Sequence, residues 1–195
     1  MMAAMLATAG AAASGDHRSD LDAIRHPDCA LAIWQRPLPD KLAALIDALD
    51  VDGIADVDAK VPVVQATMHA AVLLGAAGYE GDTAIALATE IGEMAALLAL
   101  IVAAERLRVR LEVVDTDACR RFHADMVTVR LLATLRGPGT QWIETGRPDA
   151  IEDIQTGAVA LFKGRLLIEE PRILHRSPPI GGLGIRRLVL VIDQL

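Results

Sequence analysis

The sequence has few aromatic residues: only 3% of its 195 residues are Phe, Trp or Tyr, although 53% are hydrophobic. The core must therefore be built mainly from Ala, Leu, Val and Ile. Two cysteines, Cys29 and Cys119, are too few for a disulfide framework and are typical of a reducing compartment. The longest apolar run, Met94 to Ala104, has 11 residues and is too short to span a bilayer. We therefore expect a cytoplasmic globular protein that does not enter a membrane.

Basic residues are also scarce. The chain carries 19 Lys and Arg against 26 Asp and Glu, a net charge of −7, which argues against a general nucleic-acid binder. The charge is unevenly distributed, because the segment from Cys119 onward has 11 basic and 8 acidic residues. This C-terminal part could attract a small anion while the whole protein stays acidic, although chance segregation explains the pattern equally well.

The patterning of the chain predicts an α+β fold. Residues 1–28 are rich in small and polar residues, and we expect them to be irregular. Residues 29–195 are predicted to form one domain, with a helical layer over 29–107 and a β-barrel over 108–195. Apolar spacing predicts helices over 39–50, 63–78 and 81–107. Short segments between turn residues predict strands over 29–37, 108–116, 127–135, 157–164, 165–175 and 186–193.

His123 and Asp125 are the first candidates for chemistry. Residues two apart in a strand point to the same face, so this imidazole and this carboxylate could share one ion. His175 follows 50 residues after Asp125, at the end of another predicted strand. Two histidines and one carboxylate form the facial triad of non-haem Fe(II) oxygenases, which leaves coordination positions open for a co-substrate and dioxygen. A surface turn with a structural hydrogen bond is the alternative.

Cys119 adds a soft ligand candidate four residues before His123. A set of Cys, two His and Asp is closer to a zinc site, and a closed four-coordinate ion would leave no position for catalysis. A buried thiol without a metal is the alternative for Cys119.

Arginines are the second group of candidates. Arg186 and Arg187 begin the last predicted strand and must point to opposite faces, so only one can line the barrel and hold a carboxylate. Arg130 could be a second inward cation or could face solvent. Thr140 could donate a hydrogen bond inside the pocket or serve the turn after Gly139.

The order of these motifs resembles the double-stranded β-helix of Fe(II)/2-oxoglutarate dioxygenases, in particular their prolyl-hydroxylase-like branch. The resemblance runs from Phe122 to Asp193 through HADMVTVRLLATL, GPGTQW, GAVALFKG, LHRSPP and RRLVLVID. It implies N-terminal helices packed on a C-terminal jelly-roll, cupin-like barrel. It also implies that His123, Asp125 and His175 hold Fe(II). The 2-oxoglutarate carboxylate would then bind at Arg186 or Arg187, with Arg130 and Thr140 near it.

A second resemblance covers most of the chain. Cys119 before His123, together with GPGTQW and HRSPP, is similar to an uncharacterised bacterial family, a domain of unknown function (DUF1826). That resemblance implies an association with zinc homeostasis. We therefore expect a mononuclear metal-binding protein, either an oxygenase acting on a small molecule or peptide, or a non-catalytic Zn(II) protein. A barrel that binds a partner without chemistry is the third alternative, and the helix over 81–107 could form a homodimer face.

Overall fold

The fold combines two β-sheets with a small helical layer. The computed structural model describes residues 10–195. The strands are β1 (Ala12–Gly15), β2 (Leu31–Trp34), β3 (Val57–Pro62), β4 (Arg106–Val114), β5 (Val129–Arg136), β6 (Gln141–Glu144), β7 (Glu152–Asp153), β8 (Val159–Lys163), β9 (Ile173–Arg176) and β10 (Arg187–Gln194). The α-helices are α1 (Asp40–Asp47), α2 (Ala66–Ala76) and α3 (Gly81–Val102), and the 3-10 helices are η1 (Arg18–Arg25) and η2 (Val63–Gln65). The α+β class is confirmed.

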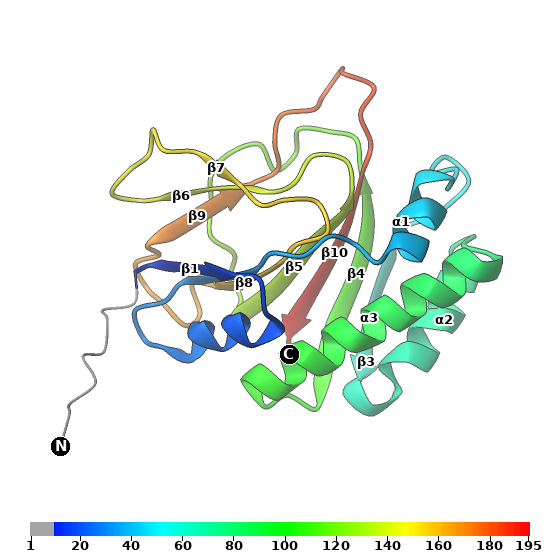
Figure 1. Cartoon of the computed structure of the whole chain (residues 1–195), viewed down its shortest axis with the longest axis horizontal. Coiled ribbons are helices and arrows are strands. Elements are labelled where there is room, and N and C mark those ends of the chain that lie inside the picture. The colour runs from blue at the N-terminus through cyan, green and yellow to red at the C-terminus, as the bar shows by residue number, and fades with distance from the viewer. Residues whose placement is uncertain (1–9) are drawn as a thin grey trace.

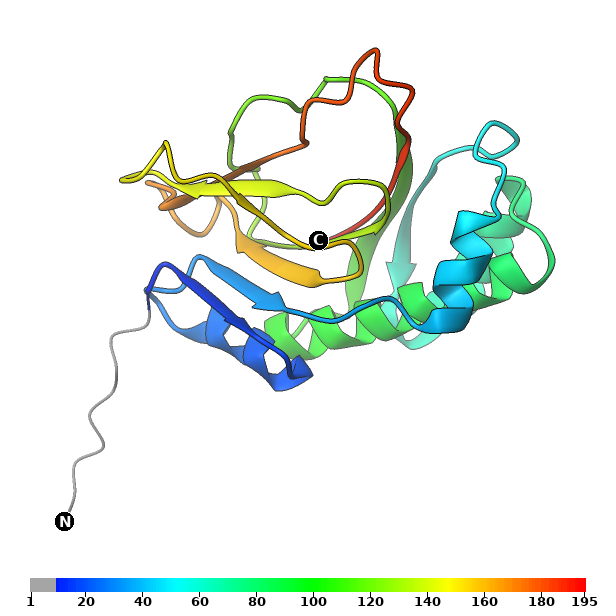
Figure 2. The ribbon, with the colours of Figure 1, turned by 45° about the horizontal axis from the view of Figure 1, so that its top comes forward.

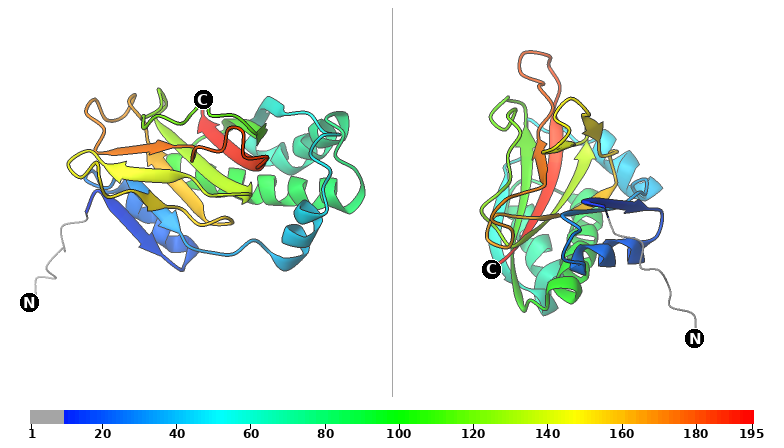
Figure 3. Two further views of the ribbon diagram at one scale, coloured as in Figure 1. Left: turned by 90° about the horizontal axis from the view of Figure 1, so that it is seen from above. Right: turned by 90° about the vertical axis from the view of Figure 1, so that its left-hand side faces the viewer.

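The larger sheet has seven strands in the order β1-β2-β8-β5-β10-β4-β3, and the smaller has three in the order β7-β6-β9. Helices α1, α2 and α3 gather along one side of the large sheet, whereas β6, β7 and β9 lie over its other side (Figures 1 and 2). The views from above and from the side show the same layering (Figure 3). Strand β10 is an inner strand between β5 and β4. Because side chains alternate along a strand, those of β10 point in turn to the helices and to the smaller sheet.

Strand β10 shows why the sequence builds two cores. Its residues alternate, and Leu188, Leu190 and Ile192 belong to the core shared with the helices. Val189 and Val191 point to the opposite side and pack in the core between the two sheets. Arg187 and Asp193 keep the parity of these two valines, so both face the space between the sheets.

Several elements differ from the prediction. Residues 12–25, expected to be irregular, form β1 and η1, because β1 pairs in parallel with β2 and Leu21 and Ile24 are buried beneath them. The expected division at 107/108 is also wrong, since β2 and β3 come from the predicted helical layer but belong to the large sheet. The third helix ends at Val102, where Ala103 takes a left-handed conformation and turns the chain into β4. The expected irregularity of residues 1–9 lies outside the described residues.

Helix α3 is long and apolar enough to cross a membrane by length and composition alone. Half of its apolar window is buried inside the fold, and its inner face contacts β10, β4 and β5. These contacts are those of a core helix.

Candidate metal centre

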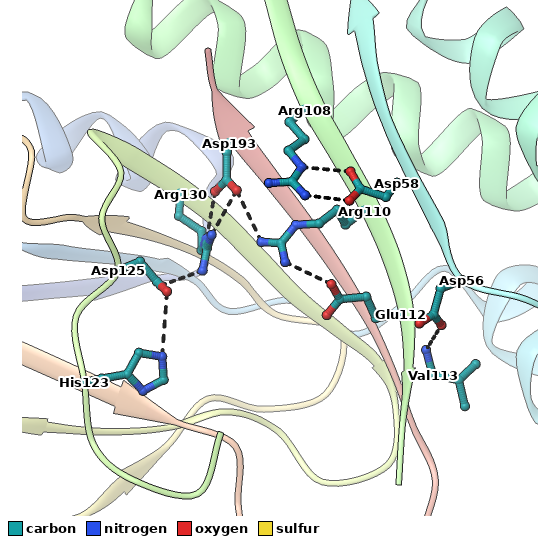
Figure 4. Close-up of polar contacts among 10 residues, drawn as sticks. All are labelled: Asp56, Asp58, Arg108, Arg110, Glu112, Val113, His123, Asp125, Arg130 and Asp193. Atoms are coloured by element: carbon teal, nitrogen blue, oxygen red, sulfur yellow. Dashed lines mark hydrogen bonds and ion pairs between the residues drawn. The ribbon is translucent and has the colours of Figure 1, made fainter. Parts of the chain in front are cut away.

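Two separate segments bring the predicted metal ligands together. His123 and Asp125 lie in the connection between β4 and β5, and His175 lies in β9. The backbones of the two histidines exchange hydrogen bonds: His123 N donates to His175 O at 3.0 Å, and His175 N donates to His123 O at 2.9 Å. Their rings stand 4.8 Å apart between centroids. Asp125 points into the same space from the segment that carries His123 (Figure 4).

The donor atoms of these three residues lie within 4.8 Å of one another. His175 Nε2 is 3.0 Å from Asp125 Oδ2, and His123 Nε2 is 3.7 Å from Asp125 Oδ1. Two ligands bound at about 2.1 Å to one ion are about 3.0 to 3.4 Å apart, depending on the angle between them. The separation between His175 and Asp125 lies in this range, that between His123 and Asp125 is a few tenths of an ångström wider, and the donor chemistry of the set suits a divalent metal ion.

His123 is prepared to act as a ligand through Nε2, and the ring of His175 is buried beside it. His123 Nδ1 lies 2.8 Å from the carbonyl oxygen of Arg121, a contact that places the ring proton on Nδ1 and the free lone pair on Nε2. His175 is buried against Phe162, with 4.5 Å between ring centroids. Burial lowers the pKa of His175, although Asp125 acts in the opposite direction, so the ring is neutral near pH 7.

Asp125 provides an ionised oxygen at the centre of the group. Burial raises the pKa of its carboxyl, but His175, Arg130 and His123 together lower the pKa well below its usual range. Oδ2 also lies 2.6 Å from Arg130 Nη1. This oxygen is shielded from solvent and has no well-aligned hydrogen bond among the described residues. A buried carboxylate oxygen in this condition fits a metal ligand.

Arg130 faces inward, which settles the alternative left open by the sequence. Its Nε and Nη2 donate to the two oxygens of Asp193 at 2.7 and 2.9 Å. Asp193 also accepts from Arg110 Nη2 at 3.2 Å, and Arg110 Nη1 donates to Glu112 Oε1 at 2.9 Å (Figure 4). An alternating chain of charges thus runs from Asp125 to Glu112. All three guanidinium nitrogens of Arg130 contact these two carboxylates, so Arg130 has no unpaired nitrogen left for a cofactor.

Arg187 is the inward member of the arginine pair and is only 2% exposed. Its guanidinium donates to Pro138 O at 2.7 Å, to Ser177 Oγ at 2.6 Å, and to the hydroxyls of Thr134 and Thr140 at 3.2 Å. All four acceptors are neutral, and burial lowers the pKa of Arg187 to about 10. Arg187 lines the same cavity of about 360 Å³ as His123, Asp125 and His175.

The remaining candidates are Arg186 and Cys119. Arg186 points to the opposite face and pairs with Asp52 at 2.6 Å, outside the lining of the cavity. The expectation that Arg186 could serve as the clamp is therefore wrong, because the register of β10 turns it away. Cys119 lines the cavity but is exposed and lies outside the group of three ligands. The buried-thiol alternative for Cys119 is wrong as well.

Sequence reasoning missed Asp193 and Arg110, although a signal for Asp193 was present. Asp193 lies six residues after Arg187 and shares its parity, so a charged side chain at this position of a buried strand had to face the same space. Predicting Arg110 would have required the register between β4 and β10, which places Arg110 opposite Val191.

Solved structures of known enzymes share this fold. A prolyl-4-hydroxylase from Pseudomonas putida is 13% identical, with 91% of this chain and 97% of that chain covered and a TM-score of 0.50. A dioxygenase for auxin oxidation from rice is 12% identical, with 94% and 82% covered and a TM-score of 0.52. At these identities the likeness shows the fold alone. No curated protein matches the sequence.

The family described as "Protein of unknown function (DUF1826)" matches residues 15–193. The chain therefore belongs to the DUF1826 family.

Proposed function

We propose that the protein is an Fe(II)- and 2-oxoglutarate-dependent oxygenase that acts on a small-molecule or peptide substrate. Arg187 carries this proposal. It is a buried guanidinium with four neutral acceptors, in the same cavity as a His-Asp-His group. A metal site alone would not need such a cation, whereas a dicarboxylate bound to the ion needs a partner for its far end.

The arrangement of the layers supports the proposal. We interpret the two facing sheets as the double-stranded β-helix of this enzyme class, with the helices packed on the outer face of the large sheet. In this arrangement the ligands come from β9 and from the connection before β5, and the clamp comes from the first residue of β10. The order of these parts along the chain agrees with the resemblance seen in the sequence.

The chain supplies binding and orientation. His123, Asp125 and His175 would hold the ion from one side and leave its other positions toward the cavity. Fe(II) with 2-oxoglutarate and dioxygen supplies the oxidising chemistry that hydroxylates a C–H bond. Thr140 and Ser177 accept hydrogen bonds from Arg187 and so fix the plane of its guanidinium. Four of the five N–H groups of Arg187 then have acceptors in the protein, which leaves one to donate to a carboxylate.

The pKa of Arg187 supports the same role. Burial lowers this pKa to about 10, so the cation is held in a poorly solvated place without a counter-charge. A carboxylate that enters the cavity would supply that charge. A charge-assisted hydrogen bond contributes about 1.5 to 3 kcal/mol, so losing the one remaining N–H donor of Arg187 should weaken binding by about that amount. This corresponds to a change in Kd of about 10-fold to 150-fold.

The test compares two neighbouring arginines. Binding of 2-oxoglutarate is measured by calorimetry with Mn(II), which occupies the site without consuming the co-substrate. Arg187→Met should weaken 2-oxoglutarate binding by at least about 10-fold. Arg186→Met is the matched control and should bind like the wild type, because Arg186 lies outside the cavity lining. Equal effects of the two variants, or no binding by the wild type, would contradict the proposal.

The identity of the metal needs a second measurement. Elemental analysis of protein purified without oxygen should give iron close to one ion per chain, and His123→Ala should lose it. Tight zinc that depends on Cys119 would instead favour the non-catalytic zinc protein.

A further inference from the structure

The cavity extends beyond the ligands and the clamp, over strand β4. Arg110 lies opposite Val191 and Glu112 opposite Val189 in the register of β4 with β10. All four residues line the cavity together with His175. Arg187 occupies the β10 end where 2-oxoglutarate is proposed to bind, so Arg110 and Glu112 form the part of the cavity left for a substrate. We call these two residues the β4 pair.

The β4 pair is fixed in place but still reachable. Arg110 donates to Glu112 Oε1 at 2.9 Å and to Asp193 Oδ2 at 3.2 Å. Its side chain is 18% exposed and that of Glu112 is 33% exposed. Arg110 Nε is shielded from solvent and has no hydrogen-bond partner among the described residues. A buried donor without an acceptor is costly, so the two carboxylates that hold this guanidinium leave it incompletely satisfied.

The charges of the cavity indicate the net charge of the substrate. Four arginines and three carboxylates line it, namely Arg110, Arg130, Arg176, Arg187, Asp56, Glu112 and Asp125. Asp193, which binds two of these arginines, balances the remaining positive charge. Fe(II) and 2-oxoglutarate would bring two positive and two negative charges. The loaded site is then balanced, so a substrate group with a net charge would enter a poorly solvated cavity uncompensated.

The β4 pair also indicates that this neutral substrate is polar. An apolar group placed on Arg110 and Glu112 would remove water from an ion pair and offer no hydrogen bonds in return. A group with one positive and one negative end would replace both lost contacts. The cavity of about 360 Å³ is also at the small end of the range of ligand sites, and it must hold 2-oxoglutarate as well.

We infer that the substrate is a small zwitterion of the amino-acid type, with its carboxylate at Arg110 and its ammonium at Glu112. The inference rests on the proposed function, because it assigns to the substrate only the part of the cavity that the metal and 2-oxoglutarate leave free. The chain of ion pairs through Asp193 and Arg130 connects this binding pair to the metal ligand Asp125. The substrate is thereby held at a fixed place relative to the ion.

The test uses protein loaded with Mn(II) and 2-oxoglutarate, titrated with each common L-amino acid in a calorimeter. At least one amino acid should bind saturably, and its N-acetyl amide, which has neither charge, should bind at least about tenfold more weakly. Glu112→Gln should lower the affinity for the free amino acid by about tenfold and leave the affinity for 2-oxoglutarate unchanged. Asp58→Asn is the matched control, because Asp58 lies in the neighbouring strand β3 and outside the cavity lining. This variant should bind the free amino acid like the wild type.

Four outcomes would overturn the inference. The blocked amino acid could bind as well as the free one, or Glu112→Gln could leave binding unchanged. No amino acid could bind while 2-oxoglutarate binds normally, and the proposed function would then stand without this substrate class. If the wild type binds neither Mn(II) nor 2-oxoglutarate, the proposed function itself fails and this inference fails with it.

Discussion

Asp193 and Asp58, two carboxylates in the large sheet, each accept two hydrogen bonds from one arginine, and Asp193 accepts a third from Arg110. Because Asp193 is far more buried, comparing the two predicts how much burial increases the stabilising effect of an ion pair. Asp193 accepts hydrogen bonds from Arg130 Nε at 2.7 Å and Nη2 at 2.9 Å. Asp58 accepts from Arg108 Nε at 2.8 Å and Nη2 at 2.5 Å. The side chain of Asp193 is 7% exposed, whereas that of Asp58 is 50% exposed. Replacing each by Asn removes the charge and keeps the shape.

The two substitutions should differ by several degrees in Tm. Breaking a buried ion pair costs about 3 to 5 kcal/mol. Arg130 and Arg110 keep Asp125 and Glu112 as partners, so the lower value, about 3 kcal/mol, applies to Asp193→Asn. A protein of 195 residues unfolds with an entropy of about 0.4 kcal/mol/K, which converts 3 kcal/mol to about 7 °C. The half-exposed pair at Asp58 should contribute about 0 to 1 kcal/mol, or less than about 3 °C.

The assay is thermal and urea unfolding of the metal-free protein at pH 7, followed by circular dichroism. Both variants should unfold in one transition with unchanged slopes, so that midpoints report the free energy of unfolding. If Asp193→Asn and Asp58→Asn lower Tm equally, the ion pairs do not differ by burial and the reasoning is refuted. Asp193→Asn as stable as the wild type would show that the buried chain of charges contributes no net stability.

Three further predictions concern the loops and the metal. Adding Mn(II) at 100 times its Kd should raise the stability of the wild type by about 2.7 kcal/mol, seen as a rise in Tm of about 7 °C, and His123→Ala should abolish this rise. A methyl group on Gly139 would meet Ile154 O at 1.6 Å, so Gly139→Ala should cost about 1 to 3 kcal/mol in urea unfolding. Gly146→Ala, whose methyl group meets nothing within 4 Å, should be near neutral. Two loop amides lower the pKa of Asp117 below its ordinary value of 3.8. Its stabilising effect should therefore be present at pH 7 and be lost as the pH falls through that lowered pKa, so the difference in Tm between wild type and Asp117→Asn should vanish in acid.

The parts of the site that obey local parity could be predicted from the sequence. His123 and Asp125 come together as predicted, although they lie in the connection between β4 and β5 and not in a strand of the kind that the prediction assumed. Alternation also showed that Arg186 and Arg187 face opposite sides. It could not decide which one faces inward, because that choice depends on the pairing of β10 with β4 and β5.

The elements that were missed depend on contacts between distant segments. Strand β3 contains Asp58, Lys60 and Pro62, a composition that is typical of a loop. Charged residues and proline are tolerated there because β3 is the edge of the large sheet. Strand β1 consists of small residues and forms only because β2 lies beside it. Neither pairing leaves a strong periodic signal in the sequence.

The reciprocal backbone bonds between His123 and His175 bear on how the protein acquires its ion. These backbone bonds hold the two histidines side by side, so folding need not wait for the metal. Small zinc modules behave differently, because their chains fold only around the ion. Little of the binding free energy is then spent on ordering the chain. Occupancy should accordingly follow the free metal concentration around the protein, and one ion could be exchanged for another without unfolding.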